Sequence, residues 1–259
     1  MKGLSPNLSL LWTELPLAER FRAARDHGFA AVEFWPWEDP AVVRREIAAT
    51  GLAVSVLNVH PGPAGSHGQL ANPDAVDWWQ KALVSAVRLA QDVGCTTVNA
   101  LTGNRIEKFT AAEQLETAAR NLATGLERIE GNGVDLVLEP LGPDRPDYLT
   151  RTVDDATTLR RAAGDPPRLK LLFDFYHLHQ TESQPVAEVF REAVGVTKHI
   201  QVADVPGRHE PGHGEIDWTA CRAAVDESGY DGWIGLEYAP SADTELSLLQ
   251  AVQIWGDPA

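Results

Sequence analysis

The chain has 259 residues, of which 22 are Lys or Arg and 37 are Asp or Glu, so its formal net charge is −15. A protein this acidic repels phosphate backbones, which disfavours general nucleic-acid binding. Hydrophobic residues make up 44% and charged residues 23%, the composition of a globular protein with a large core, so disorder and low complexity are excluded.

Membrane association and secretion are not expected either. No apolar run approaches the roughly 18–20 residues that a membrane-spanning helix needs. The first residues are interrupted by Pro6 and lack the apolar stretch of a signal peptide. The two cysteines, Cys95 and Cys221, are too few for a disulfide framework, so we expect a reducing, cytoplasmic location.

Short apolar runs alternate with longer amphipathic stretches along the whole chain. The apolar runs predict strands at residues 3–9, 30–34, 52–58, 96–100, 134–138, 169–173, 198–202 and 233–237. Helical spacing of apolar residues predicts helices over 18–27, 74–93 and 111–129. Asp39 and Asp217 are expected to be the N-caps of two further helices.

Eight strand–helix units in about 255 residues, roughly one per 30 residues, predict an α/β protein with a (β/α)8 TIM barrel. The main alternative, a doubly wound open sheet, should have a glycine-rich turn after the first strand, and residues 10–13 contain no glycine. No linker-like change of composition divides the chain, so residues 1–259 are expected to form a single domain. The longest irregular stretches follow strands, which places them on the catalytic face; they are 60–73, 102–109, 141–148 and 203–215.

The last four predicted strands each run into one side chain that can bind a metal. These side chains are Glu139, Asp174, Gln201 and Glu237. In a barrel the C-terminal ends of adjacent strands meet at one mouth, so three carboxylates and one amide would surround one point. Three carboxylates at one site cannot all stay ionised without a cation, and oxygen ligands of this kind suit Mg²⁺ or Mn²⁺.

A single acid after a strand is often only a helix cap or a loop residue. Four metal-capable side chains in four successive units are much harder to explain in that way. We therefore predict a shared divalent metal site held by Glu139, Asp174, Gln201 and Glu237.

Three histidines near the predicted mouth each have two interpretations. His177 comes just past Asp174, where it is placed to contact substrate unless it is an ordinary loop histidine. His60 opens a loop rich in Pro and Gly after the third strand, from which it could reach the mouth. His199 has the strand parity of Gln201, so it either lines the barrel or is buried structure.

Arg208 lies close behind Gln201 in a loop rich in turn-forming residues. A guanidinium binds carboxylate or phosphate in a fork, so Arg208 is a candidate for holding an anionic substrate, with a surface salt bridge as the alternative. Trp12, Trp35 and Trp37 follow the first two strands, and some of them are expected to wall the pocket.

At these residues the sequence resembles the hydroxypyruvate isomerase group of the xylose isomerase-like TIM barrels. The similarity spans nearly the whole chain and begins with residues 6–9, 32–34 and 98–103. The stronger matches are each weak alone and specific together; they are Leu138-Glu139-Pro140, Phe173-Asp174-Phe175-Tyr176-His177, the run from His199 to Asp204, the stretch 207–216, and Gly232-Trp233-Ile234-Gly235-Leu236-Glu237-Tyr238.

The resemblance implies that Glu139, Asp174, Gln201 and Glu237 hold a metal and that the two glutamates also act as acid and base. The glutamine at position 201 resembles the residue found in this group, whereas the ketose 3-epimerase branch usually has a histidine there.

The loop after Glu139 departs from the pattern of this group. Gly142 stands where relatives usually have asparagine, and Arg145 stands about where they have an acidic residue. The loop is also shortened. These departures bear on the identity of the substrate more than on the metal site.

The reaction that the resemblance implies is the isomerisation of a small hydroxy-keto acid, here hydroxypyruvate to tartronate semialdehyde. The divalent ion is expected to polarise the carbonyl and to stabilise the charge of a cis-enediolate. One of Glu139 and Glu237 would remove a proton beside the carbonyl, and the other would return a proton to the adjacent carbon. Arg208 would hold the substrate carboxylate and His177 a substrate oxygen.

Three other functions are compared with this one. A ketose 3-epimerase or a tetronate isomerase would use the same chemistry on another substrate, and nothing in the sequence excludes it. An abasic-site endonuclease of the same superfamily needs several metals, many histidine ligands and a basic DNA-binding face, which the charge of −15 and the sparse strand-end histidines argue against. A non-catalytic sugar-acid-binding barrel should have lost a ligand, and none of the four is missing.

The expected partner is a small hydroxy-keto acid or sugar, with no nucleic acid and no membrane. The sequence leaves the oligomeric state open, a homo-oligomer included. Because the expected substrate is an anion, the charge of −15 should slow its capture, so binding should depend on the metal and on Arg208.

Overall fold

The computed structural model describes residues 1–35 and 38–256, in which short strands alternate with helices. The strands are β1 (Gly3–Pro6), β2 (Ala31–Val32), β3 (Ala53–Val54), β4 (Leu57–Asn58), β5 (Thr97–Asn99), β6 (Asp135–Leu138), β7 (Leu169–Asp174), β8 (Thr197–Val202) and β9 (Trp233–Leu236). The helices are α1 (Leu17–Asp26), α2 (Pro40–Thr50), α3 (Val76–Asp92), α4 (Ala111–Arg128), α5 (Val153–Ala162), α6 (Phe175–Thr181), α7 (Val186–Ala193), α8 (Trp218–Glu227) and α9 (Thr244–Trp255), with short 3-10 helices η1 (Pro73–Ala75) and η2 (Val194–Val196).

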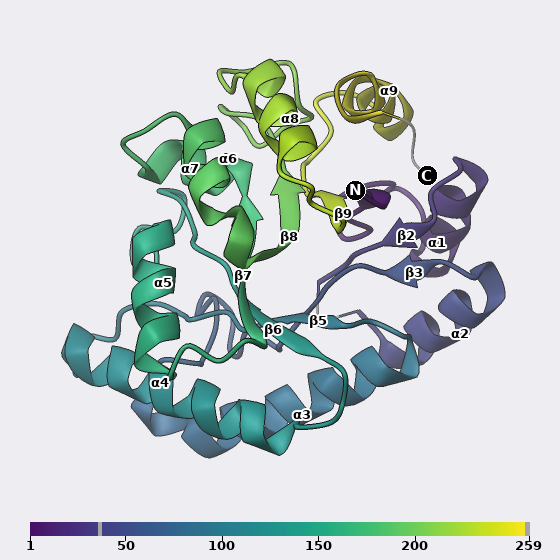
Figure 1. The fold of residues 1–259 in the computed structure, drawn as a ribbon. Helices are drawn as coiled ribbons and strands as arrows, with labels where there is room; N and C mark the ends of the chain where they lie inside the picture. The colour runs from purple at the N-terminus through teal and green to yellow at the C-terminus, as the bar shows by residue number, and fades with distance from the viewer. Residues whose placement is uncertain (36–37, 257–259) are drawn as a thin grey trace.

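The strands curl into a ring that the helices surround (Figure 1). Seven of them form one parallel sheet in the order β1-β9-β8-β7-β6-β5-β4, so the first strand lies beside the last. The strands β2 and β3 form a separate parallel pair. A parallel bridge between Asn7, just after β1, and Glu33, just after β2, connects the pair to the large sheet. This closed arrangement of parallel strands and outer helices confirms the predicted TIM barrel.

The prediction of one continuous strand over 52–58 is wrong. The structure divides this segment into β3, which pairs with β2, and β4, which pairs with β5. Between them, Ser55 donates its backbone N–H to the Val32 carbonyl at 3.0 Å, and its hydroxyl lies 2.7 Å from the Ser5 hydroxyl inside the barrel. The strand is interrupted because the chain changes hydrogen-bonding partner at this point of the ring.

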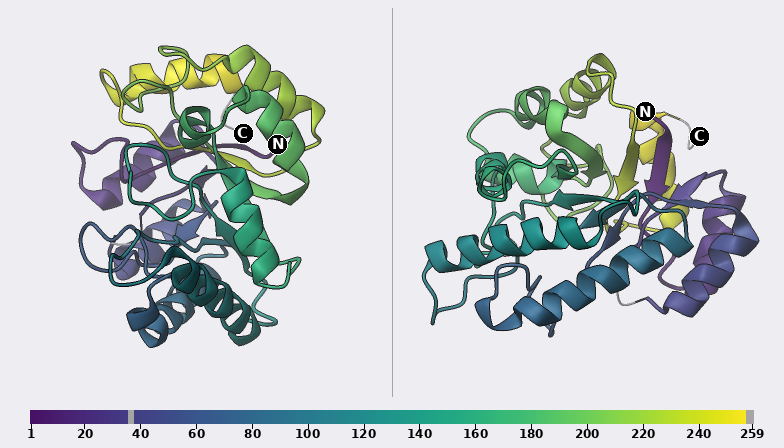
Figure 2. Two further views of the ribbon diagram at one scale, coloured as in Figure 1. Left: turned by 90° about the vertical axis from the view of Figure 1, so that its left-hand side faces the viewer. Right: turned by 60° about the horizontal axis from the view of Figure 1, so that its bottom comes forward.

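The helices cover the outside of the ring, and α3 and α4 lie side by side as its longest pair (Figure 2). The helices predicted over 18–27, 74–93 and 111–129 are confirmed, with ends within two residues of the prediction. Asp39 and Asp217 cap α2 and α8 as predicted, because their carboxylates accept backbone N–H groups of the first helical turn.

One helix begins where a loop was expected. Asp174 ends β7 and is also the N-cap of α6, because its Oδ1 accepts the backbone N–H of Tyr176 at 2.8 Å. An aspartate in this position satisfies an N–H group that would otherwise lack a partner at the helix start. His177 therefore lies in the first turn of a helix and not in a loop.

Alternation along the strands separates two environments. One large apolar core lies between the sheet and the helices, and a small second cluster, Val56, Val137 and Leu172, fills the inside of the ring. Glu139 and Asp174 come two residues after Val137 and Leu172, so they point to the same inner side one layer higher. The inner side of the barrel thus carries these two carboxylates above Val137 and Leu172, towards the C-terminal ends of the strands.

Long loops after β4, β5, β6 and β8 lie on one face of the barrel, as predicted. Isolated antiparallel bridges connect Gly68 to Thr102 and Asn104 to Tyr148, so the first three of these loops support one another. The fourth loop folds back on itself through a bridge between Asp204 and His209. Among the described helices, none combines the length and the apolarity needed to cross a bilayer.

Candidate active site

The four side chains predicted as metal ligands lie together at the C-terminal ends of β6, β7, β8 and β9. All four are buried, with exposed fractions of 6% for Glu139, 0% for Asp174, 4% for Gln201 and 5% for Glu237. Asp174 and Gln201 are direct partners in the register of β7 and β8. Their convergence therefore follows from strand register and two-residue alternation, as expected for the mouth of a barrel.

Two oxygens in this group have no hydrogen-bond partner among the described residues. They are Asp174 Oδ2 and Gln201 Oε1, both fully buried. Each side chain is anchored through its other polar atom, Asp174 by the Tyr176 backbone and Gln201 by Glu33. A buried oxygen without a donor is costly in a folded protein, so a pair of them marks a place prepared for a ligand.

The two glutamates are held differently. Glu139 accepts one hydrogen bond from Asn99 Nδ2 at 2.6 Å. Glu237 Oε1 accepts from Trp35 Nε1 at 2.8 Å and from Asn7 Nδ2 at 3.3 Å. These bonds fix both carboxylates at the mouth, and among the described residues no donor bonds the second oxygen of Glu139.

His177 lies beside the carboxylates of Glu139 and Asp174. Among the described residues, ligand atoms of Glu139, Asp174 and His177 all fall within 4.8 Å. His177 Nδ1 accepts the Gly142 backbone N–H at 3.0 Å, so the proton of the neutral ring is on Nε2, which lies 3.6 Å from Asp174 Oδ2. This tautomer makes His177 a hydrogen-bond donor and not a metal ligand.

Burial disfavours the ionised form of the three carboxylates in the cluster. Burial, followed by the nearby charges of Glu237 and Asp174, raises the pKa of Glu139 well above its usual value. Burial likewise raises the pKa of Asp174 to about 7 against the opposing charge of Arg208, and raises the pKa of Glu237. Burial lowers the pKa of His177 well below its usual value, with Arg208 and Arg145 adding to the effect, so this ring is neutral.

Arg208 lies inside the cluster. Its Nη2 donates to Glu237 Oε2 at 2.7 Å and lies 3.6 Å from Asp174 Oδ2, and its guanidinium stacks over the Tyr176 ring at 5.3 Å. Burial opposes the charged form of Arg208, but the charges of Glu237 and Asp174 outweigh it and raise its pKa. With Arg208 paired, three carboxylates and one guanidinium leave the cluster at a formal charge of −2.

The loop of Arg208 is held in a strained conformation. Arg208 has a φ of 58°, in the left-handed region that side chains disfavour. Asp204 keeps the loop in place by accepting the backbone N–H groups of Gly212 and Gly214 and the indole N–H of Trp218. Such strain persists only where the surroundings fix it, which is common at functional sites.

A cavity of about 480 Å³ opens above the cluster. Its lining includes Glu139, Glu237, His177 and Arg208, together with Trp35, Leu141, Arg145, His67 and the loop 60–65. This volume falls in the range of small-molecule sites.

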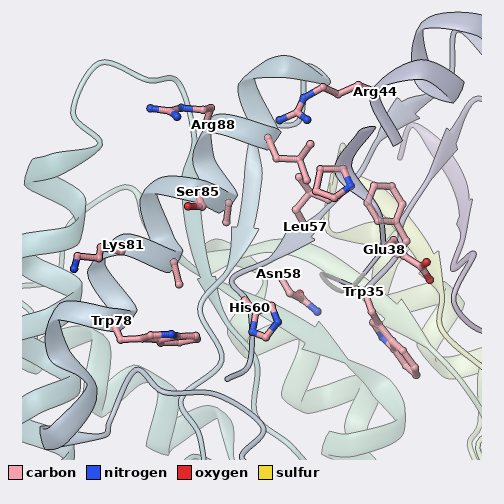
Figure 3. Close-up of a pocket in the computed structure, with 15 residues that line it drawn as sticks. Trp35, Glu38, Arg44, Leu57, Asn58, His60, Trp78, Lys81, Ser85 and Arg88 are labelled. Carbon is pink, nitrogen blue, oxygen red and sulfur yellow. The ribbon is translucent and has the colours of Figure 1, made fainter. Parts of the chain in front are cut away.

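His60 lies at the edge of this cavity and not among the carboxylates. Its ring contacts Trp78 of α3 edge-on at 5.9 Å, and its Nδ1 accepts the Gly62 backbone N–H. Figure 3 shows His60 between Asn58 and Trp78, with Trp35 nearby, in a groove of about 620 Å³ beside the cavity. His60 thus reaches the mouth, as the sequence allowed, but it lies farther from the carboxylates than His177 does.

The three tryptophans considered as pocket walls, Trp12, Trp35 and Trp37, have different outcomes. Trp35 lines the cavity and bonds Glu237, as one of the expected wall residues. Trp12 is buried in the outer core, where its ring packs against His27 and Phe29. Trp37 lies outside the described residues.

Comparison with known proteins agrees with the fold. The family model for xylose isomerase-like TIM barrels matches residues 21–255. The chain belongs to the xylose isomerase-like TIM barrel family. The resemblance stated from the strand-end motifs is therefore confirmed.

Relatives in this family include isomerases of similar length. A 2-oxo-tetronate isomerase of Cupriavidus necator is 33% identical over 253 residues, which cover 96% of this chain and 96% of that protein. The hydroxypyruvate isomerase of Escherichia coli is 29% identical over 263 residues, covering 100% of this chain and 99% of that protein. A solved structure named AP endonuclease, family 2, from Brucella melitensis has a TM-score of 0.90 at 29% identity and covers 96% of this chain and 97% of that one. The isomerase relatives confirm the prediction of an isomerase.

The sequence analysis missed three residues that hold the predicted metal ligands in place. Asn7, Glu33 and Asn99 are buried and each bonds a predicted ligand. A signal for Glu33 was present, because a charged residue stood inside the apolar run 30–34. His199, for which two interpretations were open, lines the barrel interior and places its Nε2 2.8 Å from Glu33 Oε2.

Proposed function

We propose that the chain is a metal-dependent isomerase that interconverts hydroxypyruvate and tartronate semialdehyde, or a closely related small hydroxy-keto acid. The observation that carries the proposal is the pair of buried oxygens without partners, Asp174 Oδ2 and Gln201 Oε1, beside two glutamates with raised pKa values. The 2-oxo-tetronate and hydroxypyruvate isomerases among the relatives support the same class of substrate.

The residues fit a divalent cation. Glu139, Asp174, Gln201 and Glu237 offer oxygen donors only, which suits Mg²⁺ or Mn²⁺. The formal charge of −2 that remains beside Arg208 would be neutralised by one such ion. When bound, the ion supplies Lewis-acid polarisation of a substrate carbonyl.

Glu139 and Glu237 are the groups that would move protons. Both carboxylates line the cavity, where a carboxylate beside the substrate can take and return a proton. One glutamate takes a proton from the hydroxymethyl carbon of hydroxypyruvate to give a cis-enediolate. The other delivers a proton to the former carbonyl carbon. The proton of the hydroxymethyl oxygen moves to the former carbonyl oxygen, which leaves the aldehyde of tartronate semialdehyde.

The cavity wall would hold the rest of the substrate. His177, neutral and protonated at Nε2, is suited to donate to a substrate oxygen. Arg208 would hold the substrate carboxylate while its Nη2 keeps the bond to Glu237. His60 would contact the substrate from the rim, beside Trp35.

The test is proton exchange with solvent. Purified protein with Mn²⁺ is incubated in D₂O with hydroxypyruvate, 2-oxo-tetronate and a set of ketoses, and the products are analysed by NMR. We expect deuterium at the carbon next to the carboxylate of the product, and no reaction after chelation. Turnover without deuterium incorporation would indicate hydride shift, and absence of turnover on every substrate would favour a non-catalytic sugar-acid-binding barrel.

A 2-oxo-tetronate isomerase or a ketose 3-epimerase is the second candidate. A cavity of about 480 Å³ has room for a longer chain than three carbons, and one relative is named for a four-carbon acid. The same substrate set separates these activities by relative rate.

An endonuclease is disfavoured despite the name of the Brucella structure. The described residues contain one group of three His, Cys, Asp or Glu ligands, whereas the multi-metal chemistry expected for that activity needs more. The charge of −15 also opposes DNA binding.

Two wider proposals accompany the activity. We place the whole chain in one domain, because the barrel closes between β1 and β9 at its two ends. We also place the protein in the cytoplasm, on the basis that Cys95 and Cys221 are buried free thiols.

A further inference from the structure

Glu33 is the most deeply buried carboxylate of the barrel mouth that the mechanism does not use. It follows β2 directly and is 1% exposed. No lysine or arginine pairs with it among the described residues. Instead, neutral donors and one histidine surround it.

Its two oxygens have separate sets of partners. Oε1 accepts from Gln201 Nε2 at 2.8 Å and from Asn7 Nδ2 at 3.2 Å. Oε2 lies 2.8 Å from His199 Nε2 and accepts the Ser55 hydroxyl at 3.4 Å. Glu33 therefore connects four side chains from three different parts of the ring, because Gln201 and His199 both lie on β8.

Space for this carboxylate is provided by a glycine in β9. A Cβ on Gly235 would lie 2.3 Å from Glu33 Oε2 and 2.8 Å from its Oε1. No side chain would fit at position 235 unless Glu33 moved. The glycine and the glutamate thus occupy one side-chain site on the inner wall of the barrel.

We propose that Glu33 is a positioning residue that sets the orientation of the Gln201 amide, so that Oε1 faces the cation site. An amide has nearly identical shapes at its oxygen and nitrogen ends, and only its partners decide which end points where. An ionised carboxylate accepts hydrogen bonds and cannot donate them. Glu33 Oε1 at 2.8 Å therefore selects the Nε2 end of Gln201 and leaves Oε1 without a protein partner.

The same carboxylate reaches the other side of the cluster through Asn7. The Nδ2 group of Asn7 lies 3.2 Å from Glu33 Oε1 and 3.3 Å from Glu237 Oε1. Its two hydrogens thus serve one carboxylate each. Glu33 positions a neutral ligand directly and an acid/base carboxylate through one intermediate amide.

This inference rests on the metal site of the proposed function, and its test is the affinity for Mn²⁺ alone, followed by the electron paramagnetic resonance signal of the free ion. In Glu33→Gln the new side chain can donate as well as accept, so both orientations of the Gln201 amide become possible. We expect Mn²⁺ binding to weaken about 10- to 100-fold, the usual effect of losing a partner that orients a ligand.

A second variant restores the pairing with exchanged roles. In Glu33→Gln/Gln201→Glu the amide at 33 donates to a carboxylate at 201, which offers its other oxygen to the cation. We expect this double variant to bind Mn²⁺ at least as tightly as wild type. Gly235→Ala displaces the Glu33 carboxylate without removing it and should also weaken binding.

The matched control is Glu46→Gln. Glu46 is also 1% exposed but lies on α2, where it pairs with Arg22 and Arg45. It should leave Mn²⁺ affinity unchanged. Thermal melting in EDTA shows whether each variant is folded.

Each outcome bears on a different claim. If wild type binds no Mn²⁺, the metal site of the proposed function is wrong. If wild type binds and folded Glu33→Gln binds within twofold of it, the role of Glu33 is overturned. If Glu33→Gln binds weakly and the double variant does not recover, Glu33 does not act through the Gln201 amide, and the inference is again overturned.

Discussion

Two groups of buried carboxylates meet in this barrel mouth, and they differ in how their oxygens are satisfied. Glu33 has at least two donors or close partners on each oxygen. Asp174 has one bonded oxygen and one with no hydrogen-bond partner among the described residues, although Asp174 and Glu33 are both buried. Glu33 therefore serves as scaffold, whereas the unsatisfied oxygen of Asp174 marks a place prepared for a ligand.

The largest expected effect falls on Glu237, which belongs to the cluster of Asp174 although both of its own oxygens are bonded. Glu237→Gln keeps the shape of the side chain and the bonds from Trp35 and Asn7 can adapt, but the amide cannot exchange a proton. We expect deuterium incorporation in the product to fall by roughly 10²- to 10⁴-fold, the usual contribution of an acid/base group. NMR of the reaction in D₂O measures it.

A matched control tests whether burial alone explains such a loss. Glu210 is 2% exposed and lies in the loop of Arg208, but its carboxylate is bonded to Ser241. Glu210→Gln should retain activity within a few-fold. Equal losses in both variants would mean that the place of Glu237 in the cluster has no bearing on function.

The next effect concerns the free energy of unfolding. A cation that binds only the folded state stabilises it by about 2.7 kcal/mol at a concentration of 100 times its dissociation constant. For a chain of this size we expect Mn²⁺ to raise the melting temperature by about 5–10 °C. Asp174→Asn should abolish most of this shift, because it removes the ligand whose Oδ2 has no partner. A wild-type melting temperature that ignores Mn²⁺ would contradict the metal site.

The pH dependence of stability sharpens the comparison without any metal. Asp174 has its pKa raised to about 7 in the folded protein, mainly by burial. Between about pH 4 and pH 7 the folded state keeps this proton while the unfolded state has lost it, so stability falls as pH rises. Melting in EDTA should therefore occur at lower temperature near pH 8 than near pH 5.

Asp174→Asn separates this cause from general charge repulsion in a chain of net charge −15. The variant has no titrating carboxyl at that position, so its loss of stability with rising pH should be smaller. An unchanged slope would assign the effect to the rest of the chain. The comparison of slopes, rather than the absolute melting temperatures, decides the point.

The side of the site formed by the last four strands was predictable from sequence, and the reason is periodicity. Each ligand ends an apolar run, and parallel strands carry their C-terminal ends to one mouth, so Glu139, Asp174, Gln201 and Glu237 could be placed without coordinates. Their roles as ligands stay predictions until a metal is measured.

The side of the site near β2, β3 and β4 could not be predicted from the sequence. These strands have two residues each and give little periodic signal. Ser55 changes partner in the middle of one apolar run, and Glu33 depends on the absence of a side chain at Gly235, two strands away in the ring. Such close approaches between distant segments leave no local pattern. The pairing of Arg208 with Glu237 is likewise a tertiary contact that loop composition alone does not reveal.

The smallest expected effect comes from replacing His177, and it decides whether this residue serves the substrate or belongs to the metal ligands. Its Nδ1 is occupied by the Gly142 N–H, so its Nε2 carries the proton and should serve the substrate as a donor. His177→Leu should then cost roughly tenfold in kcat/KM, the loss of one hydrogen bond, and leave Mn²⁺ affinity within about twofold of wild type. Gly142→Ala, whose Cβ would lie 3.0 Å from Nδ1, should give a weaker version of the same result. A fall in Mn²⁺ affinity in His177→Leu would instead move His177 into the ligand set with Glu139 and Asp174, whose ligand atoms already lie within 4.8 Å of its own.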